Sequence, residues 1–332
     1  METYPIDFVI TWVDGADREW IAEKSKYSGT KDVDAEISRY RDFGTLRYLL
    51  RSIEKFAPWV RKIFLVTNGQ VPEWLSFENP KIRIVKHGDY MPQEYLPTFS
   101  SHPIEWNFHK IKDLSEHFVY FNDDLLLTDY VQPSDFFRKG LPLDTFGLGV
   151  VEPVQFFSYI QFNHMVLLNN RFDFREVLKK HWKKLLSLKN GKPAVRSLLL
   201  SKKRVFYGMY DTHLTMAFNK SMFEKVWEEN AFEIDRTCKN KFRSQNDISI
   251  WVVRYYQMLN GAFFPRSNKF GKFLVVHDFI REEKVRKSVM KGKCKVICLN
   301  DNNWDFADFE TERKAFDGIM NTILGEKCSF EK

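Results

Sequence analysis

Short apolar runs that end in Asp, Asn or Gly constrain the fold of this sequence more than any other feature. Four of them, at residues 6–13, 62–67, 81–85 and 118–121, have the length and the β-branched or aromatic composition of buried strands. Apolar residues at helical spacing between Gly44 and Pro58 predict a helix after the first run, and residues 111–117 are expected to form a short one before the fourth. This alternation predicts a doubly wound α/β sheet, in which ligands bind beyond the carboxyl ends of the strands.

The rest of the chain continues in the same way. Residues 221–227 and 247–259 are expected to be helical, residues 273–276 and 295–299 to form strands, and residues 17–38 to form a loop with some helix. No repeat, low-complexity tract or linker divides the 332 residues. We therefore predict a single domain over residues 1–332, with an inserted basic helical region over residues 165–205.

The charge of the chain is positive and locally concentrated. Its net charge of +7 favours polyanionic partners such as nucleotides, phospholipid headgroups, nucleic acid or acidic glycans. Twelve Lys or Arg residues and two acidic ones lie between Arg171 and Arg204, where Val177, Leu178 and Trp182 lie near one face of an expected helix. Such a helix fits an anionic membrane surface, and it equally fits a solvated helix whose apolar stripe packs on the core.

The four cysteines and the first residues argue against a secreted, disulfide-bonded protein. Cys294 and Cys298 lack a second close Cys or His pair that would complete a zinc site, so reduced thiols are expected. The first five residues carry an acid rather than a basic segment, which predicts no signal peptide. No run approaches the roughly 18 apolar residues of a membrane span, so any membrane contact is expected to be peripheral.

Acidic residues at two strand ends carry the clearest chemical signal. Asn122, Asp123 and Asp124 follow the fourth expected strand, and Asp14 and Gly15 follow the first. Adjacent carboxylates offer hard oxygen ligands for Mg²⁺ or Mn²⁺ bridging to a diphosphate. Each group also has a structural interpretation, because Asp-Asp and Asp-Gly pairs commonly open turns.

Further polar residues lie in the loops and at helix starts. Arginines can pair with phosphate oxygens, imidazoles can move protons, and a serine, a histidine and a carboxylate together suggest a hydrolytic triad. The triad is disfavoured, because no strained strand-to-helix turn surrounds the serines. The residues concerned are Arg39, Arg41, Asp42, Arg47, Arg51, Ser100, Ser101, His102, Glu105, Asp211, His213, Arg243, Asn246 and Asp247.

Taken together, these residues resemble the Stealth family, which comprises bacterial capsular and cell-wall polysaccharide phosphotransferases and the animal lysosomal-enzyme N-acetylglucosamine-1-phosphotransferase. The resemblance covers nearly the whole chain, with counterparts to all four characteristic regions in order. It is carried by residues 6–15, 39–53, 57–70, 96–102, 118–124 and 295–301. It departs from the family at His213-Leu214-Thr215, where a His-Met-Pro sequence is usual.

The resemblance implies a role for each matching residue. Catalytic roles fall on Asp124, His213, Arg243 and His102, with His213 or Asp124 as the base and Arg243 and Arg51 stabilising charge. Metal ligands are Asp123, Asp124 and Asp301. Residues of the nucleotide-sugar site are Asp14, Gly15, Arg39, Arg41, Asp42, Arg51, Ser101, Glu105, Asn246 and Asn300.

The resemblance also implies the fold and the reaction. The sheet would be mixed and glycosyltransferase-A-like, and the cofactor Mg²⁺ or Mn²⁺. A sugar hydroxyl would attack the sugar-linked phosphorus of a UDP-sugar, release UMP and leave hexose 1-phosphate or N-acetylhexosamine 1-phosphate in a phosphodiester. The acceptor would be an oligosaccharide or a lipid-linked glycan, and the enzyme cytoplasmic, resting against the inner face of the membrane, with no nucleic-acid partner.

Two other functions remain open. A metal-dependent glycosyltransferase would bind the same donor through Asn122, Asp123 and Asp124 but release UDP. A non-catalytic basic module for nucleic acid or membrane would use residues 171–204. That module leaves the acidic strand ends unexplained, because carboxylates repel phosphates unless a cation intervenes.

Overall fold

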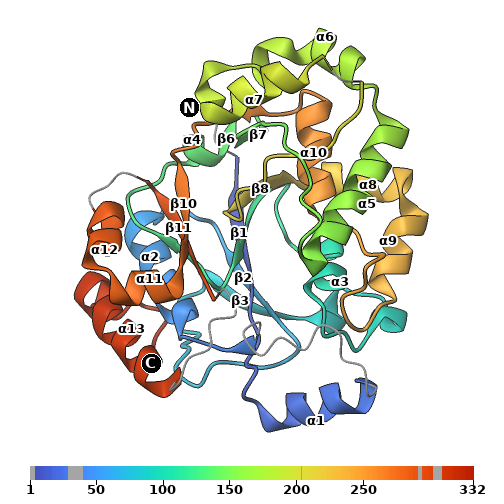
Figure 1. Cartoon of the computed structure of the whole chain (residues 1–332). Helices are drawn as coiled ribbons and strands as arrows, with labels where there is room; N and C mark the ends of the chain where they lie inside the picture. Colours follow the sequence, from blue (N-terminus) through green and yellow to red (C-terminus); the bar gives the residue numbers. More distant parts are fainter. Residues whose placement is uncertain (1–3, 29–39, 203, 291–293, 302–308) are drawn as a thin grey trace.

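The computed structural model describes residues 4–28, 40–202, 204–290, 294–301 and 309–332 (Figure 1). Its strands are β1 (Ile6–Thr11), β2 (Ile63–Thr67), β3 (Ile82–Lys86), β4 (His117–Asn122), β5 (Leu125–Leu127), β6 (Phe137–Arg138), β7 (Leu141–Asp144), β8 (Met216–Asn219), β9 (Phe264–Pro265), β10 (Gly271–Val275) and β11 (Val296–Asn300). Its α-helices are α1 (Arg18–Tyr27), α2 (Thr45–Phe56), α3 (Ser101–Trp106), α4 (Pro133–Phe136), α5 (Phe156–Arg171), α6 (Phe174–Leu185), α7 (Lys192–Leu200), α8 (Lys220–Glu229), α9 (Ala231–Cys238), α10 (Trp251–Leu259), α11 (Val276–Arg281), α12 (Glu283–Met290) and α13 (Phe309–Leu324).

The central sheet has the strand order β3-β2-β1-β4-β8. Strands β1 to β4 are parallel, and β8 runs antiparallel to β4 at the edge. The chain moves outward from β1 to β3 and then returns to add β4 on the other side of β1. The strand order therefore reverses between β1 and β4, which makes the carboxyl ends of these two strands the expected ligand site.

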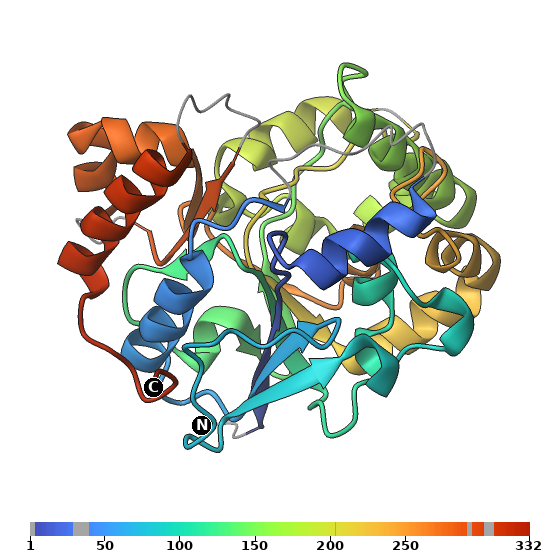
Figure 2. The same ribbon diagram turned by 90° about the horizontal axis from the view of Figure 1, so that it is seen from below.

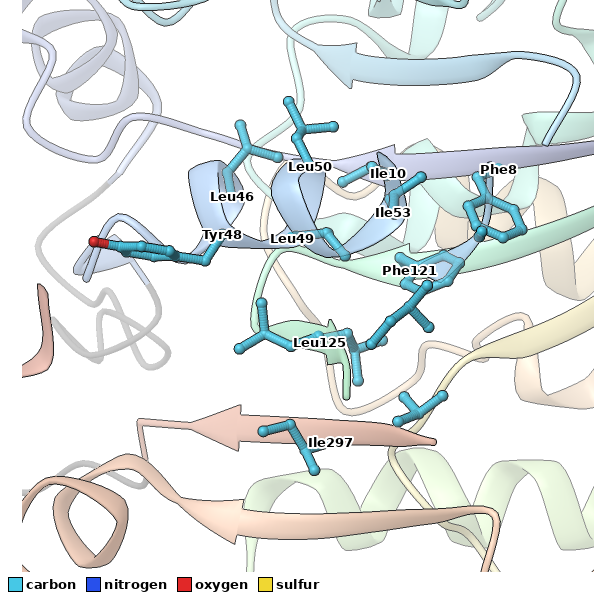
Figure 3. Packing of buried hydrophobic residues seen from close by; sticks show 14 of the residues in the cluster. Phe8, Ile10, Leu46, Tyr48, Leu49, Leu50, Ile53, Phe121, Leu125 and Ile297 are labelled. Carbon is cyan, nitrogen blue, oxygen red and sulfur yellow. The ribbon is translucent and has the colours of Figure 1, made fainter. Parts of the chain in front are cut away.

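Helices cover both faces of this sheet, on the left and right of the strands in Figure 2. Phe8 and Ile10 of β1 face α2, whose Leu49 and Ile53 are fully buried with them (Figure 3). Val9 points to the opposite face, into the cluster that holds residues of α8 and α10. Successive residues of a strand alternate between faces, so the all-apolar run requires cover on both. The predicted doubly wound α/β fold with a mixed sheet is confirmed.

A second, smaller sheet extends the structure beyond β4. Its order is β10-β11-β5, with β11 parallel to β10 and antiparallel to β5. Cys298 of β11 lies opposite Leu125 of β5, only three residues after the end of β4. A strand from the last part of the chain is thereby held against the carboxyl end of β4. A third sheet, β6-β7-β9, completes the strands.

The prediction of a helix at residues 111–117 is wrong. Residues 111–116 form turns, β4 already begins at His117, and the helix in this connection is α3, further upstream. Asp113 has a positive φ of 66°, a conformation that right-handed helices exclude, and its carbonyl accepts a hydrogen bond of 2.6 Å from Arg61. Buried Ile111 and Leu114 gave the apolar spacing of a helix, but they anchor a turn.

The basic region lies along α5, α6 and α7, between β7 and β8 in the chain. The apolar stripe of α6 packs on the core: Val177 and Leu185 are buried, while Trp182 stays half exposed. Of the two interpretations of this helix, the structure supports the solvated helix. Among the described residues, no helix is both long and apolar enough to span a bilayer.

Candidate active site

Two carboxylates follow β4 at the switch point of the sheet, which is the place between β1 and β4 where the strand order reverses. Asp123 and Asp124 follow β4 directly, and the turn they form leads into β5. Oδ2 of Asp124 accepts hydrogen bonds from Sγ of Cys298 at 3.2 Å and from Nδ2 of Asn300 at 3.3 Å. The backbone carbonyl of Asp124 accepts a further bond from the amide of Leu299 at 2.8 Å. Strand β11 therefore fixes the position of Asp124.

The antiparallel edge strand brings His213 to the same place. Because Met216 of β8 pairs with Tyr120 of β4, the residues before β8 lie beyond the carboxyl end of β4. Nε2 of His213 is 3.8 Å from Oδ2 of Asp124, and the imidazole is 45% exposed. His213 has a positive φ of 40°, a strained conformation for a non-glycine residue that is frequent at functional sites. The geometry places an accessible imidazole directly against a carboxylate.

Cys298 is a site residue that the sequence analysis missed. Asn300 was predicted, and Cys298 precedes it by two positions on the same strand, so strand periodicity alone would have placed both side chains on one face. All four cysteines are free and buried. Burial, reinforced by Asp124, raises the pKa of the Cys298 thiol well above its usual range. The thiol of Cys298 donates its hydrogen bond to Asp124.

Several aspartate carboxylates lie close together at the site, and their environment shifts their pKa values. Burial and the charges of Asp124 and Asp42 raise the pKa of Asp123 well above its usual range. Burial likewise raises the pKa of Asp42, and Asp14 adds to this rise. Burial would also raise the pKa of Asp124, but His213, together with the hydrogen bonds from Cys298 and Asn300, outweighs it and lowers that pKa. A positive group placed among these four acids would relieve the repulsion.

The end of β1 forms a tight turn that positions Asp14. The amide of Asp14 donates to Oε1 of Gln70 at 2.9 Å, and Nε2 of Gln70 donates back to the carbonyl of Asp14 at 3.0 Å. Gly15 packs so closely on the backbone that a Cβ atom there would lie 2.1 Å from the carbonyl oxygen of Tyr40. Only glycine fits this approach.

A pair of glycine substitutions tests this turn. We expect Gly15→Ala to destabilise the protein by about 1–3 kcal/mol, because the backbone of Tyr40 must move. Gly318→Ala in α13 is the matched control: a Cβ there meets nothing within 4 Å, so the better helix former should add about 1 kcal/mol. Urea unfolding measures both. Equal effects of the same sign would contradict the close packing of Gly15.

A pocket of about 700 Å³ opens beside Asp14. Four of the predicted nucleotide-sugar residues line it, together with aromatic and cationic side chains. The lining residues are Asp14, Gly15, Ala16, Trp20, Ile21, Lys24, Ser25, Ser28, Tyr40, Arg41, Asp42, Phe309, Glu310 and Arg313. The ring centroids of Trp20 and Tyr40 are 5.0 Å apart. Paired rings, cations and acids in one pocket suit a ligand that combines a flat base, hydroxyls and phosphates.

The loop after α9 contributes Arg243. Its Nη2 donates to Oγ of Ser101 at 3.1 Å, and its positive charge acts on His213. Glu105, one turn after Ser101 on α3, accepts a hydrogen bond of 3.0 Å from the hydroxyl of Tyr120. Because Tyr120 belongs to β4, these contacts fix α3 and the Arg243 loop against the strand that ends in Asp124.

His102 of α3 contacts the loop that carries Arg243. It is buried, and its Nδ1 lies 3.2 Å from Oδ2 of Asp247. Asp247 also accepts bonds from the amide of Ser244 at 2.9 Å and from Nδ2 of Asn240 at 2.7 Å. The placement of His102 indicates that it positions the Arg243 loop. Asn246 lies in the same loop and is exposed.

Arg41 and Asp301 face each other. Nε and Nη2 of Arg41 donate to the two carboxylate oxygens of Asp301 at 2.7 and 2.9 Å. Asp301 follows β11 and was predicted as a metal ligand. In the structure, the carboxylate of Asp301 forms a bidentate ion pair with Arg41, which lines the pocket.

Arg51 lies elsewhere, which corrects the prediction that it belongs to the nucleotide-sugar site. It is buried on α2, where Nε and Nη2 donate to Glu331 at 2.6 and 2.9 Å and Nη1 donates to the carbonyl of Leu324 at 2.7 Å. Its guanidinium thus joins α2 to the C-terminal segment and faces no phosphate site. Arg39, also predicted here, lies outside the described residues.

The residues present fit a divalent cation. Within the described part of the chain, Asp124, His213 and Cys298 each offer one ligand atom, all within 4.8 Å of one another. Oδ1 of Asp124 is buried and has no hydrogen-bond partner among those residues. A cation could bind this buried carboxylate oxygen, which has no hydrogen-bond donor among the described residues and lies beside other acids. Carboxylate ligands suit both Mg²⁺ and Mn²⁺.

Comparison with known proteins identifies the family. The models of Stealth protein conserved regions 1 and 2 match residues 4–32 and 39–143. Exopolysaccharide phosphotransferase cps2G of Lactiplantibacillus plantarum is 38% identical over 99% of this chain and 97% of its own. Capsular polysaccharide phosphotransferase WcwK of Streptococcus pneumoniae is 38% identical over 98% of both chains. Receptor polysaccharide phosphotransferase WefC of Streptococcus oralis is 37% identical over 98% of this chain and 99% of its own.

Among solved structures, the galactosyltransferase LgtC in complex with donor and acceptor sugar analogues is 10% identical. It matches with a TM-score of 0.41 over 96% of this chain and 95% of its own. The relatives that match nearly the whole chain are polysaccharide phosphotransferases, so the chain is an enzyme of the transferase class. The chain belongs to the Stealth family of polysaccharide phosphotransferases.

Proposed function

We propose that this enzyme transfers a sugar 1-phosphate from a UDP-sugar to a hydroxyl group of a glycan and releases UMP during synthesis of a capsular or other cell-surface polysaccharide. The observation that carries the proposal is the convergence of Asp124, His213 and Arg243 with the Asp14 pocket at the switch point of the sheet. The names of the relatives support the phosphotransferase activity. The convergence of residues from both halves of the chain supports one catalytic domain over 1–332.

The pocket beside Asp14 is the proposed donor site. Trp20 and Tyr40 offer aromatic surface for the uracil ring, and Asp14 offers oxygens for ribose hydroxyls. Arg41 and Arg313 also line the pocket, so their charge favours the pyrophosphate. Asp42, which lines the pocket and whose charge acts on Asp123, connects the donor pocket to the carboxylates at the end of β4. The pyrophosphate would lie at that junction.

The proposed chemistry is an in-line displacement at phosphorus. The acceptor hydroxyl oxygen forms a bond to the sugar-linked phosphorus, and the bond from that phosphorus to the bridging oxygen breaks, so that UMP leaves with the bridging oxygen. The hydroxyl proton passes to the enzyme. Catalysis of such a step depends mainly on alignment and on stabilisation of negative charge.

His213 is the proposed proton acceptor. Its Nε2 is within 3.8 Å of Asp124 and its ring is half exposed, so an acceptor hydroxyl can reach it. Burial acts to lower the pKa of His213, but Asp124 outweighs it and raises that pKa above the ordinary value, which strengthens His213 as a base. Arg243, held by Ser101, adds positive charge beside the reacting phosphoryl group.

Asp124 and Asp123 are the residues that would hold a Mg²⁺ or Mn²⁺ ion. A bound divalent cation would neutralise phosphate charge that the acids otherwise repel. The protein's own contribution is to keep both carboxylates in place through β11, with Cys298 and Asn300 occupying Oδ2 of Asp124.

The leaving group tests the proposal. The purified enzyme is incubated with a UDP-sugar, Mg²⁺ or Mn²⁺ and a mixture of glycan acceptors, and the nucleotides are separated by chromatography. We expect UMP to accumulate only when acceptor, cation and enzyme are all present. A metal-dependent glycosyltransferase would accumulate UDP instead, and that result would overturn the proposal. A parallel incubation without acceptor corrects for hydrolysis of the donor.

The acceptor and the place of the reaction follow from the same chemistry. Oligosaccharides and lipid-linked glycans carry the free hydroxyl groups that the reaction consumes. A UDP-sugar donor is a cytoplasmic metabolite, so the proposed reaction takes place on the cytoplasmic side.

A further inference from the structure

Helix α5 has two different faces. Its inner face contacts the loops of the site: Nε2 of Gln161 donates to Asp211 at 3.3 Å, and Nδ2 of Asn163 donates to the carbonyl of Asp247 at 3.0 Å. Its outer face carries Tyr159 and Phe162, which are 53% and 62% exposed. Aromatic residues three positions apart on a helix lie side by side, so they form an exposed apolar stripe.

Helix α7 repeats this pattern. Its Ser197 is buried and accepts a hydrogen bond of 2.8 Å from the amide of Leu148, which attaches the helix to the body of the protein. Its outer side presents Val195, Leu198 and Leu199, the last 73% exposed. Three neighbouring aliphatic side chains on one short helix have no partner among the described residues. Such a patch marks an interaction surface.

The segment after α7 joins the two helices. Phe206 exchanges two hydrogen bonds with the side chain of Asn169 on α5, at 2.8 and 2.9 Å. The next residue, Tyr207, accepts a bond of 3.0 Å from the amide of Val151 and keeps its own ring half exposed. Arg196 of α7 lies close to Gly149, whose amide donates to the carbonyl of Gly208 at 2.8 Å, so this segment lies near α7 as well as α5. We call the exposed apolar side chains of α5, α7 and this segment the α5–α7 face. It comprises Tyr159, Phe162, Val195, Leu198, Leu199 and Tyr207.

Basic side chains lie on and directly after α7, beside the aliphatic part of this face. Lys192 and Arg196 are exposed on α7, and Lys202 and Arg204 are exposed immediately after it. Over residues 171–204 the sequence holds twelve basic and two acidic residues. The adjoining surface therefore attracts anions, while the aliphatic side chains favour an apolar environment.

We propose that the α5–α7 face docks on a lipid bilayer that contains anionic headgroups. A bilayer surface offers both negative charge and an apolar environment. Basic side chains pair with the headgroups, while aliphatic and aromatic side chains enter the boundary of the acyl region. A protein partner would need a matching acidic and apolar face, whereas any anionic bilayer supplies these properties without specific geometry. Docking needs neither donor nor acceptor and is independent of the proposed reaction.

Docking through this face would also orient the site. The inner side of α5 contacts the loops that carry His213 and Arg243, through Asp211 and Asp247. One helix thus separates the bilayer from the reacting groups. A glycan attached to a lipid in that bilayer would reach the site over a short distance.

Sedimentation with vesicles tests the docking. The whole purified chain is mixed with vesicles of phosphatidylcholine alone or of phosphatidylcholine with phosphatidylglycerol, at low and high salt. We expect binding only to the anionic vesicles, weaker at high salt. The double variant Leu198→Gln, Leu199→Gln should bind about tenfold or more weakly. Lys192→Gln and Arg196→Gln should each weaken binding about fivefold and reduce its salt dependence.

The control is Phe232→Gln on α9, because Phe232 is also 73% exposed but lies outside the α5–α7 face. This variant should bind the vesicles like the unchanged protein, and all variants should unfold at the same temperature. Equal binding by the double leucine variant would overturn the proposal. Light scattering without vesicles tests whether a second copy of the chain covers the α5–α7 face instead. A dimer that dissociates on substitution of the two leucines would also overturn the proposal of bilayer docking.

Discussion

Replacement of Asp124 by Asn should reduce sugar-phosphate transfer about a thousandfold. Oδ2 of Asp124 already accepts bonds from Cys298 and Asn300, while Oδ1 is buried without a donor among the described residues. The amide would remove the negative charge that holds a cation and pairs with His213. Loss of a metal-holding or transition-state-stabilising group typically costs several kcal/mol of barrier, which corresponds to a rate factor of this order.

The measurement is UMP formation under single-turnover conditions, together with calorimetric titration of Mn²⁺. Asp129→Asn is the matched control, because Asp129 lies five residues along the chain and, among the described residues, accepts only a local bond of 2.7 Å from the amide of Tyr130. That variant should keep full activity and cation affinity. A normal rate in the Asp124 variant would remove Asp124 from the mechanism, and lost activity with normal Mn²⁺ affinity would remove it from the cation site.

Replacement of Arg254 by Met should destabilise the fold by about 3–5 kcal/mol. Arg254 is 1% exposed and donates to both carboxylate oxygens of Asp144 at 2.6 and 2.9 Å. It also donates to the carbonyls of Thr145 and Tyr210 at 3.0 and 3.1 Å. Burial raises the pKa of neighbouring Asp211 to about 6 even with Arg254 present. Methionine fills a similar volume but leaves these acids and carbonyls without a cation.

Urea unfolding, followed by far-UV circular dichroism, measures the effect. Lys239→Met is the control, since Lys239 pairs with Asp235 at a comparable 2.7 Å but is 54% exposed, and an exposed pair is worth at most about 1 kcal/mol. If Arg254→Met does not accumulate in folded form, the double variant Arg254→Met, Asp144→Leu should recover part of the loss, because no unpaired charge stays at Asp144. Equal stability of Arg254→Met and Lys239→Met would contradict the buried network.

The strand ends were predictable from sequence for a physical reason. Buried parallel strands must be apolar on both faces, so β1, β2 and β4 stand out, and their first polar residues are necessarily at the ligand-binding edge. Asp14 and Asp124 could therefore be assigned to one edge without coordinates. Helix α2 was equally clear, because its apolar positions cover one face.

The partners of charged residues were not predictable. Arg41 and Arg51 follow one another closely in sequence and both looked suited to phosphate. Arg41 reaches Asp301 at the pocket, whereas Arg51 turns to Glu331 on the other side of α2. Which way an arginine points depends on acids hundreds of residues away, and a single sequence does not show which of them become neighbours.

Short and unusually placed elements were also missed. Strand β8 has four residues, and it positions His213 only because it runs antiparallel to β4. Helices α5 and α13 were not assigned, although they are the longest in the described structure. The outer residues Tyr159 and Phe162 obscure the polar face that would have given α5 its period.

The pairing of β11 with β5 has a consequence for biosynthesis. Asp124 is translated first, and Cys298 of the strand that holds it follows 174 residues later. Until then the nascent polypeptide carries its acidic turn without Cys298 and Asn300, and the centre stays incomplete. The enzyme should therefore gain activity only after β11 has been translated, and a ribosome stalled before β11 would display an inert chain.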